Sequence, residues 1–388
     1  MKWKKLFRIK NLAILFVLFA LAFTVWYFQL SNRHKAIVKT TLLHSFGIID
    51  NDWEIEESTY AWKLESPELL VDNIYQSMDG PQAVLNLNMN PNSEKVQWIT
   101  GFKAEVLREG TSEHNNDLLC HTNIDYYDAV HYKNLKLPKR INTVYPRLGT
   151  LSNGINELNF PDGFGFPVAS DDAFIIASRT LNHNIENAFF KVKHHIELKT
   201  APANANLKPL VPKGLVLMLP YDLENPYKSK KNDPNLCSPI DLKNHSGPGE
   251  DGVSLSAHWK LPEGETRYEF DITYQLNLNE NTTIHAMAAH LHPGAQKFEL
   301  FDITLNETVY SFECENYADK IGLKNVPNYS SVEGIELFSD HQYKLILDTY
   351  NPGTGFRDMM AVLFIYLYDK ELEQVLIEHD LTGLSVTN

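Results

Sequence analysis

The sequence is poor in cysteine and in long helical periodicity. Its 388 residues contain three cysteines, Cys120, Cys237 and Cys314, which allow at most one intramolecular disulfide. Disulfides therefore cannot be the main support of the fold. Apolar residues at helical spacing are scarce after residue 35, and no repeat of solenoid length occurs, so a helical bundle and a solenoid are both excluded.

Basic residues are also scarce outside the N-terminus. The chain has 35 Lys and Arg against 49 Asp and Glu, but the first 35 residues contain seven of the bases and no acid. The remaining 28 bases against 49 acids leave a body with a formal charge of −21. An acidic body argues against nucleic acid as a partner and against electrostatic docking on an anionic leaflet.

One long apolar run occurs near the N-terminus, over residues 12–28, and Leu30 extends it. Its length is near the ~20 residues that span a bilayer. More basic residues precede the run than follow it, so the positive-inside rule places residues 1–10 in the cytoplasm and exports the body. We expect a single-pass signal-anchor at 11–30. The alternative is a signal peptide cleaved after Ala20-Leu21-Ala22, which would leave apolar residues exposed on the mature chain.

The body shows short alternating or apolar segments separated by Gly, Pro and Asn. Examples are 83–87, 96–99, 102–107, 173–180, 189–198, 214–219 and 268–272. This pattern predicts an all-β fold, and about 350 residues exceed one typical core. We expect two antiparallel β-sandwich (jelly-roll-like) domains at 50–200 and 216–388, joined by a linker at 201–215. Residues 224–251 are predicted to form a long exposed loop.

The motif His290-Leu291-His292 lies within strand-like sequence. On a strand, both imidazoles project from one face while Leu291 points away. Two neutral imidazoles on a rigid face are suitable ligands for Cu, Zn, Fe or Ni. The alternative is a chance pair in a chain with 15 histidines.

A second feature, Met359-Met360, follows Asp358 and precedes another apolar strand-like run. The methionine thioether is a soft donor that favours copper, especially Cu(I), over zinc. The alternative is that both methionines fill a gap in the core, which is the commonest use of Met.

Together these segments resemble a known family. HAMAAHLH (residues 285–292), ELFD (299–302) and DMMAVLFIYLYD (358–369) occur in an order similar to the second domain of the copper type II, ascorbate-dependent monooxygenases, which include peptidylglycine α-hydroxylating and dopamine β-monooxygenases. The resemblance implies that His290, His292 and Met359 hold the oxygen-binding copper.

The resemblance extends more weakly into the first half. Residues 160–168 are similar to the glycine-bearing segment before the third ligand of the family's first copper, and residues 118–123 occupy the place of its adjacent His-His pair. It therefore implies an electron-transfer copper held by Cys120, His121 and His183, with Cys120 replacing an imidazole. Alternatively, Cys120 is an ordinary buried residue, because adjacent side chains on a regular strand face opposite ways and both ligate only at a bulge or strand end.

Four other histidines are not expected to bind a metal ion. His194 is predicted to share the buried face of its strand. His258 and His285 are interpreted as structural, and His114 as a turn residue.

The resemblance implies a membrane-anchored, exported monooxygenase that uses ascorbate or a similar reductant. Its two coppers are expected to face each other across a solvent-filled cleft between the domains. The family's carboxylate-binding Arg and Tyr correspond here to Ala288 and Leu363, so a small-molecule or other weakly charged substrate is expected. Two alternatives stay open. One is a non-catalytic copper-binding or copper-handling protein with only the His290, His292 and Met359 site. The other is a metal-free β-sandwich interaction module.

Overall fold

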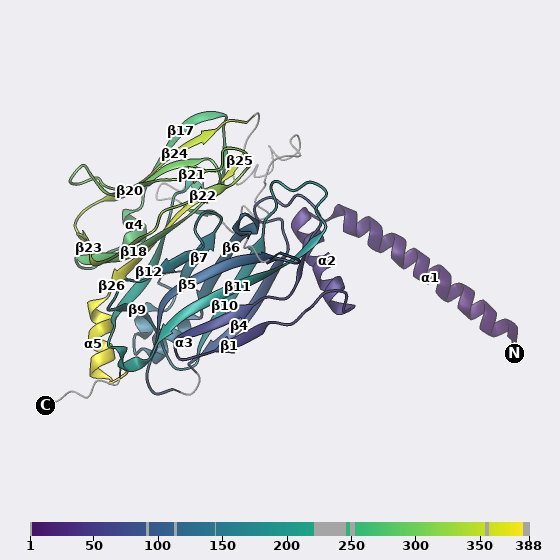
Figure 1. The fold of residues 1–388 in the computed structure, drawn as a ribbon, viewed down its shortest axis with the longest axis horizontal. Helices are drawn as coiled ribbons and strands as arrows, with labels where there is room; N and C mark the ends of the chain where they lie inside the picture. The colour runs from purple at the N-terminus through teal and green to yellow at the C-terminus, as the bar shows by residue number, and fades with distance from the viewer. Residues whose placement is uncertain are drawn as a thin grey trace.

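The body is built almost entirely of antiparallel strands, as the sequence predicts (Figure 1). The computed structural model describes residues 2–90, 93–111, 115–143, 145–220, 246–248, 253–353 and 357–382. Within these residues the chain forms two β-sandwiches after an N-terminal apolar helix, which confirms the predicted fold class.

The N-terminus forms two helices, α1 (Lys2–Gln29) and α2 (Asn32–Ser45). Figure 1 shows α1 extending away from the body. Its Asn11–Gln29 part is long and apolar enough to cross a membrane and makes no buried contact with the body. An apolar helix therefore occupies the predicted place. The second helix was not predicted; it starts after Ser31, whose hydroxyl accepts a hydrogen bond from the backbone N–H of His34.

The first sandwich has two facing sheets. One has the order β1-β2-β11-β5-β9, and in it β3 also pairs with β11 and β8 with β5. The other has the order β4-β10-β6-β7. Burial alternates along β11, where Val192, His194 and Ile196 face the core. The strands are β1 (Glu54–Glu57), β2 (Ala61–Glu65), β3 (Leu69–Val71), β4 (Gln82–Met89), β5 (Gln97–Arg108), β6 (Leu119–Tyr126), β7 (Arg147–Ser152), β8 (Glu157–Asn159), β9 (Phe164–Val168), β10 (Asp172–Thr180) and β11 (Phe190–Ala201).

The second sandwich pairs the sheet order β12-β26-β18-β23 with the order β17-β24-β19-β20. Its strands are β12 (Lys208–Val216), β17 (Gly264–Asp271), β18 (Thr282–Leu291), β19 (Ala295–Asp302), β20 (Glu307–Glu313), β23 (Tyr329–Leu337), β24 (Tyr343–Asn351) and β26 (Ala361–Tyr368). Short strands border it: β13 (Leu219–Pro220), β14 (Ser246–Pro248), β15 (Ser254–Ser256), β16 (Trp259–Leu261), β21 (Glu315–Asn316), β22 (Leu323–Asn325) and β25 (Arg357–Met359). Of the loop predicted at 224–251, only β14 lies among the described residues.

Short helices complete the body. They are η1 (Asn116–Leu118), α3 (Asp128–Asn134), η2 (Pro138–Arg140), η3 (Ala203–Ala205), α4 (Thr273–Leu276) and α5 (Lys370–Glu378). Helix α5 was not predicted. It packs Leu372 and Leu376 inward, and its N-cap Asp369 forms an ion pair with Arg140 of the first half.

The junction between the sandwiches differs from the predicted linker at 201–215. Strand β12 begins at Lys208 and pairs in parallel with β9, at Lys208↔Phe164 and Pro209↔Gly165, while its other edge pairs with β26. The prolines suggested a linker, but Pro209 and Pro212 are accommodated in the strand with buried Leu210 between them. One sheet therefore runs through both halves, and only residues 202–207 connect β11 to β12.

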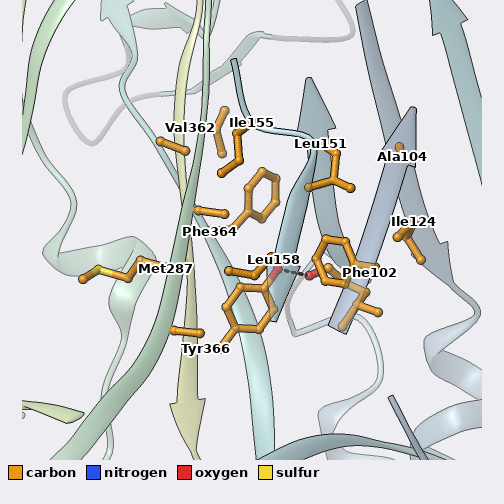
Figure 2. Packing of buried hydrophobic residues seen from close by; sticks show 14 of the residues in the cluster. Phe102, Ala104, Ile124, Leu151, Ile155, Leu158, Met287, Val362, Phe364 and Tyr366 are labelled. Carbon is orange, nitrogen blue, oxygen red and sulfur yellow. Dashed lines mark hydrogen bonds between the residues drawn. The ribbon is translucent and has the colours of Figure 1, made fainter. Parts of the chain in front are cut away.

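A tyrosine from the second half completes the core of the first. Tyr366 on β26 is fully buried, and its hydroxyl donates to the carbonyl of Leu148 at 2.8 Å (Figure 2). Its ring packs against Phe160, with centroids 4.8 Å apart. Gly149 makes room for this contact, because a Cβ there would lie 2.5 Å from the Phe102 ring and 2.7 Å from the tyrosine hydroxyl.

Tyr366→Phe is expected to destabilise the protein by about 1–3 kcal/mol, because it leaves the buried Leu148 carbonyl without its donor. Urea unfolding of the full chain in detergent measures this loss. The exposed Tyr60→Phe is the matched control and should unfold like the wild type. Equal stability of the two variants would contradict the role assigned to this hydrogen bond.

If α1 is an uncleaved anchor, the extracted protein should retain Met1 and stay with the membrane fraction after a high-salt wash, because an apolar span is not held by charge. N-terminal sequencing and fractionation test this. A soluble protein beginning at Phe23 would show that the chain is cleaved after Ala22.

Candidate functional site

The two histidines of the predicted HxH motif lie together at the end of β18. His290 is opposite Val362 of β26, and His292 directly follows the strand. Their ring centroids are 5.3 Å apart, and each residue is only 6% exposed. The predicted common face is therefore present, and it is buried.

Asp358 on β25 orients His292. Its main-chain carbonyl accepts a hydrogen bond from Nδ1 of His292 at 3.3 Å, and one carboxylate oxygen lies 3.1 Å from the same Nδ1 and 3.5 Å from Nδ1 of His258. Burial opposes ionisation of Asp358, but these two histidines outweigh it and hold its pKa at about 2. Because a main-chain carbonyl and an ionised carboxylate only accept hydrogen bonds, the His292 proton belongs on Nδ1, and Nε2 keeps its lone pair, which faces the hydroxyl of Ser77.

Met359, the third predicted ligand, is a core residue. It is fully buried in the apolar core, where its methyl group lies near Gly294 and Leu261. Strand β25 pairs regularly with β16, so neighbouring side chains point to opposite faces. Asp358 faces the histidines, and the sequence argument missed this carboxylate next to the predicted methionine.

In the first half, β6 has a bulge at the predicted ligands. His121 pairs with Arg179 and Leu119 pairs with Thr180, so Cys120 is an extra residue without a partner position on β10. A bulge lets consecutive side chains depart from strict alternation. The condition under which Cys120 and His121 could both serve one site is therefore met.

The two predicted ligand sets meet instead of facing each other across a gap. The rings of His121 and His290 are in edge contact, with centroids 6.2 Å apart. The electrostatic partners of His183 include His292 and Asp358. We call the group His121, His183, His258, His290, His292 and Asp358 the histidine cluster. It lies at the junction and draws on both sandwiches, so the expected separation into two facing sites is wrong.

Burial keeps three of these imidazoles neutral. Desolvation lowers the pKa of His121 and of His290 well below the usual value, and the positive charge of Arg179 adds to the effect on His121. Burial also lowers the pKa of His183 to about 4. Neutral imidazole is the form that binds metal ions, so these side chains are in the ligand-competent state near neutral pH.

Burial disfavours the ligand form of Cys120, in contrast to the imidazoles. Burial raises its pKa, and contacts with Met78 and Ser77 and the nearby Arg179 offset this only in part. The neutral thiol is therefore favoured over the thiolate that ligates copper. Ser77 also approaches the cluster directly, with its hydroxyl 3.5 Å from Nε2 of His292.

The imidazole rings of the cluster are close enough to share one metal ion. With metal–nitrogen bonds of about 2.0–2.1 Å, two imidazoles on one ion have centroids at most about 6.4 Å apart. The His290–His292 and His121–His290 separations of 5.3 and 6.2 Å satisfy this limit. Among the described residues, however, no three His, Cys, Asp or Glu side chains are already arranged around one point. A shared ion would thus require ring rotation.

Several polar atoms of the cluster are unsatisfied. Nδ1 of His290 is buried and has no hydrogen-bond partner within the described part of the chain. The same is true of Nδ1 of His183 and of one carboxylate oxygen of Asp358. Buried polar atoms without partners cost about 1–3 kcal/mol each, so a ligand at this point would be stabilising.

The remaining histidines have the roles expected for them, with one exception. His194 is fully buried and bonds Ser178 and Thr180 at 2.5 and 2.9 Å. His285 stacks on Phe164, with centroids 3.9 Å apart. His258 was interpreted as structural, but its ring lies 5.9 Å from that of His292 within the cluster. His114 lies outside the described residues.

The neutral buried imidazoles predict a loss of stability in acid. Because the unfolded chain binds protons near pH 6.5 and folded His121 and His290 do not, each reduces the unfolding free energy by up to roughly 1.4 kcal/mol per pH unit as the pH falls below 6.5. Urea unfolding between pH 7.5 and 5 measures this slope. His290→Gln should make it shallower, whereas exposed His379→Gln should not, and equal slopes for both would contradict the assignment.

No family model and no curated protein sequence matches the chain. Among solved structures, it is similar to a peptide-N(4)-(N-acetyl-β-D-glucosaminyl)asparagine amidase at 9% identity and a TM-score of 0.32, over 79% of this chain and 96% of that one. The structure of PNGF-II is similar at 10% identity and a TM-score of 0.31, over 77% and 65%. These likenesses concern the fold alone and carry no argument about function.

Proposed function

We propose that this protein is an exported, membrane-anchored copper-binding protein that holds one copper ion in the histidine cluster. The observation that supports it most is the buried Nδ1 of His290, which lacks a hydrogen-bond partner among the described residues, on a ring between those of His121 and His292. The proposal places one ion among these three imidazoles.

The donor chemistry supports copper over other first-row metals. The donors offered are neutral imidazoles, which suit Cu, Zn, Fe and Ni, and Cu(II) binds such sites most tightly of the divalent ions. Hard oxygen-ligated ions such as Mg²⁺ and Ca²⁺ would need several oxygen donors. The cluster offers the carboxylate of Asp358, which is already directed at His258 and His292.

The residues of the cluster would hold the ion in two ways, as direct ligands and as a group that orients a ligand. Asp358 fixes the tautomer and orientation of His292, which presents Nε2, while His290 and His121 present rings from opposite sandwiches. Carboxylate–histidine pairs of this kind also raise the basicity of the ligating nitrogen. A copper ion held here would supply one-electron redox chemistry.

The two-copper monooxygenase is the second candidate, and the family resemblance of residues 285–292 and 358–369 is what favours it. That function needs two separate centres, an ascorbate-like reductant and a weakly charged substrate. The contact between His121 and His290 and the core position of Met359 favour a single centre instead. Copper stoichiometry separates the two candidates.

Full-length protein purified in detergent and loaded with copper should contain one copper per chain. The His290→Ala, His292→Ala double variant should lose it, because it removes two of the three proposed imidazole ligands. Met359→Leu should retain the copper, since the thioether faces the core, and so should the control His379→Ala on the exposed end of α5. Elemental analysis measures all four proteins.

Two coppers per chain would instead support the monooxygenase. Absence of copper from the wild type would support the metal-free interaction module instead. Copper that the double variant retains would contradict the assigned ligands, provided that its circular dichroism matches that of the wild type.

A further inference from the structure

Helix α2 connects the apolar helix rigidly to the body. Lys39 on α2 forms an ion pair with Asp72, and both the Lys39 ammonium and Asp72 also contact the hydroxyl of Tyr75. Ala36 and Thr40 are buried on the inner face of the same helix. The end of α1 is therefore held at a fixed part of the body.

The segment 72–80 leads from this attachment to the histidine cluster. The backbone of Tyr75 exchanges two hydrogen bonds with Asn182, the neighbour of His183, at 2.8 and 2.9 Å. Two residues further along, the Ser77 hydroxyl lies 3.5 Å from Nε2 of His292. The cluster thus lies close to the end of the body that carries α1.

Three large apolar side chains are exposed at this same end. Phe46 is 74% exposed, Ile48 64% and Phe189 81%. We call these three residues the apolar rim. Phe46 and Ile48 follow α2, and Phe189 precedes β11.

Glu68 shows that the rim residues are neighbours in space. Its carbonyl contacts the ring of His44 at 2.8 Å, and its carboxylate bonds the N–H of Asp50 at 3.0 Å and the ammonium of Lys191 at 2.8 Å. Each rim residue is two positions from one of these partners, within about 7.6 Å along the chain. Glu68 therefore holds together the three chain segments that carry the rim residues.

Charge favours an uncharged partner for this rim. The acidic body is not attracted to an anionic surface, whereas exposed Phe and Ile gain free energy on entering the apolar edge of a bilayer. Two of the rim residues follow α2, and α2 joins the body to the helix that is long enough to span a membrane. A bilayer surface is the one apolar partner that the position of α1 brings to it.

We propose that the apolar rim is a membrane-contact surface that inserts into the bilayer interface around α1 and holds the histidine cluster on the membrane-facing side of the body. The proposal rests on the membrane-anchored part of the proposed function and does not depend on copper. Ligands of the cluster would then exchange close to the lipid surface.

Nitroxide labels on the full chain in phosphatidylcholine vesicles test this. Phe46→Cys and Phe189→Cys are labelled in a Cys237→Ser background, because Cys120 and Cys314 are buried. The control is Tyr127→Cys, 46% exposed and next to the start of β10. That strand ends at Thr180, which bonds Pro81 directly after the segment 72–80, so the control lies about 23 Å from this segment along the strand.

Collision rates with oxygen, which concentrates in lipid, and with a water-soluble nickel chelate give the depth of each label. For side chains buried ~5–10 Å into the interface, the oxygen-to-nickel ratio at both rim positions should exceed that of the control by about tenfold. Equal ratios at all three positions would overturn the proposal. Labels shielded from both reagents would overturn it too, because they would indicate a protein partner. None of these outcomes depends on metal content, so they are distinct from failure of the copper proposal.

Discussion

The geometry of the histidine cluster depends on strand β26, which is buried on both faces between β12 and β18. All but the last of its residues are buried, and it sets the register of both neighbours. Because His290 lies opposite Val362 in that register, its ring is directed to the first sandwich, where it meets His121. A slip of one residue would turn His290 to the opposite face and break the cluster.

The cluster also places several polar groups where water cannot solvate them. A buried imidazole remains tolerable when it is neutral and costs most when protonated. Asp358 is the only member with a firmly held charge, and His258 and His292 on either side of it account for its low pKa. One ionised carboxylate thus lies beside the rings of His258 and His292. The other rings of the cluster form no ion pair with a carboxylate among the described residues. This asymmetry distinguishes the ends of the cluster and makes the His290 side the natural place for a ligand.

Much of the architecture could be predicted from the sequence, because alternation of apolar residues along strands such as β10 and β11 reflects their burial directly. The HxH pair was predictable for the same reason, since i and i+2 share a face on any strand. The meeting of His121 with His290 was not, because it depends on the parallel pairing of β9 with β12, which no local pattern shows. The role of Asp358 could have been found: on a short strand, the residue beside a core methionine must point the other way. Helix α2 was missed since its buried face is limited to small residues such as Ala36.

The contact of Tyr366 with Leu148 joins residues 218 positions apart in the chain. This has a consequence for how the protein is made. If the body is exported as we propose, the first sandwich crosses the membrane while the strand that fills the space beside Gly149 is still being synthesised. Until β26 arrives, that region exposes the ring of Phe102 and the unpaired edge of β12. On that proposal, the first half would need protection by chaperones on the far side of the membrane, because folding is completed only when nearly the whole chain has been delivered.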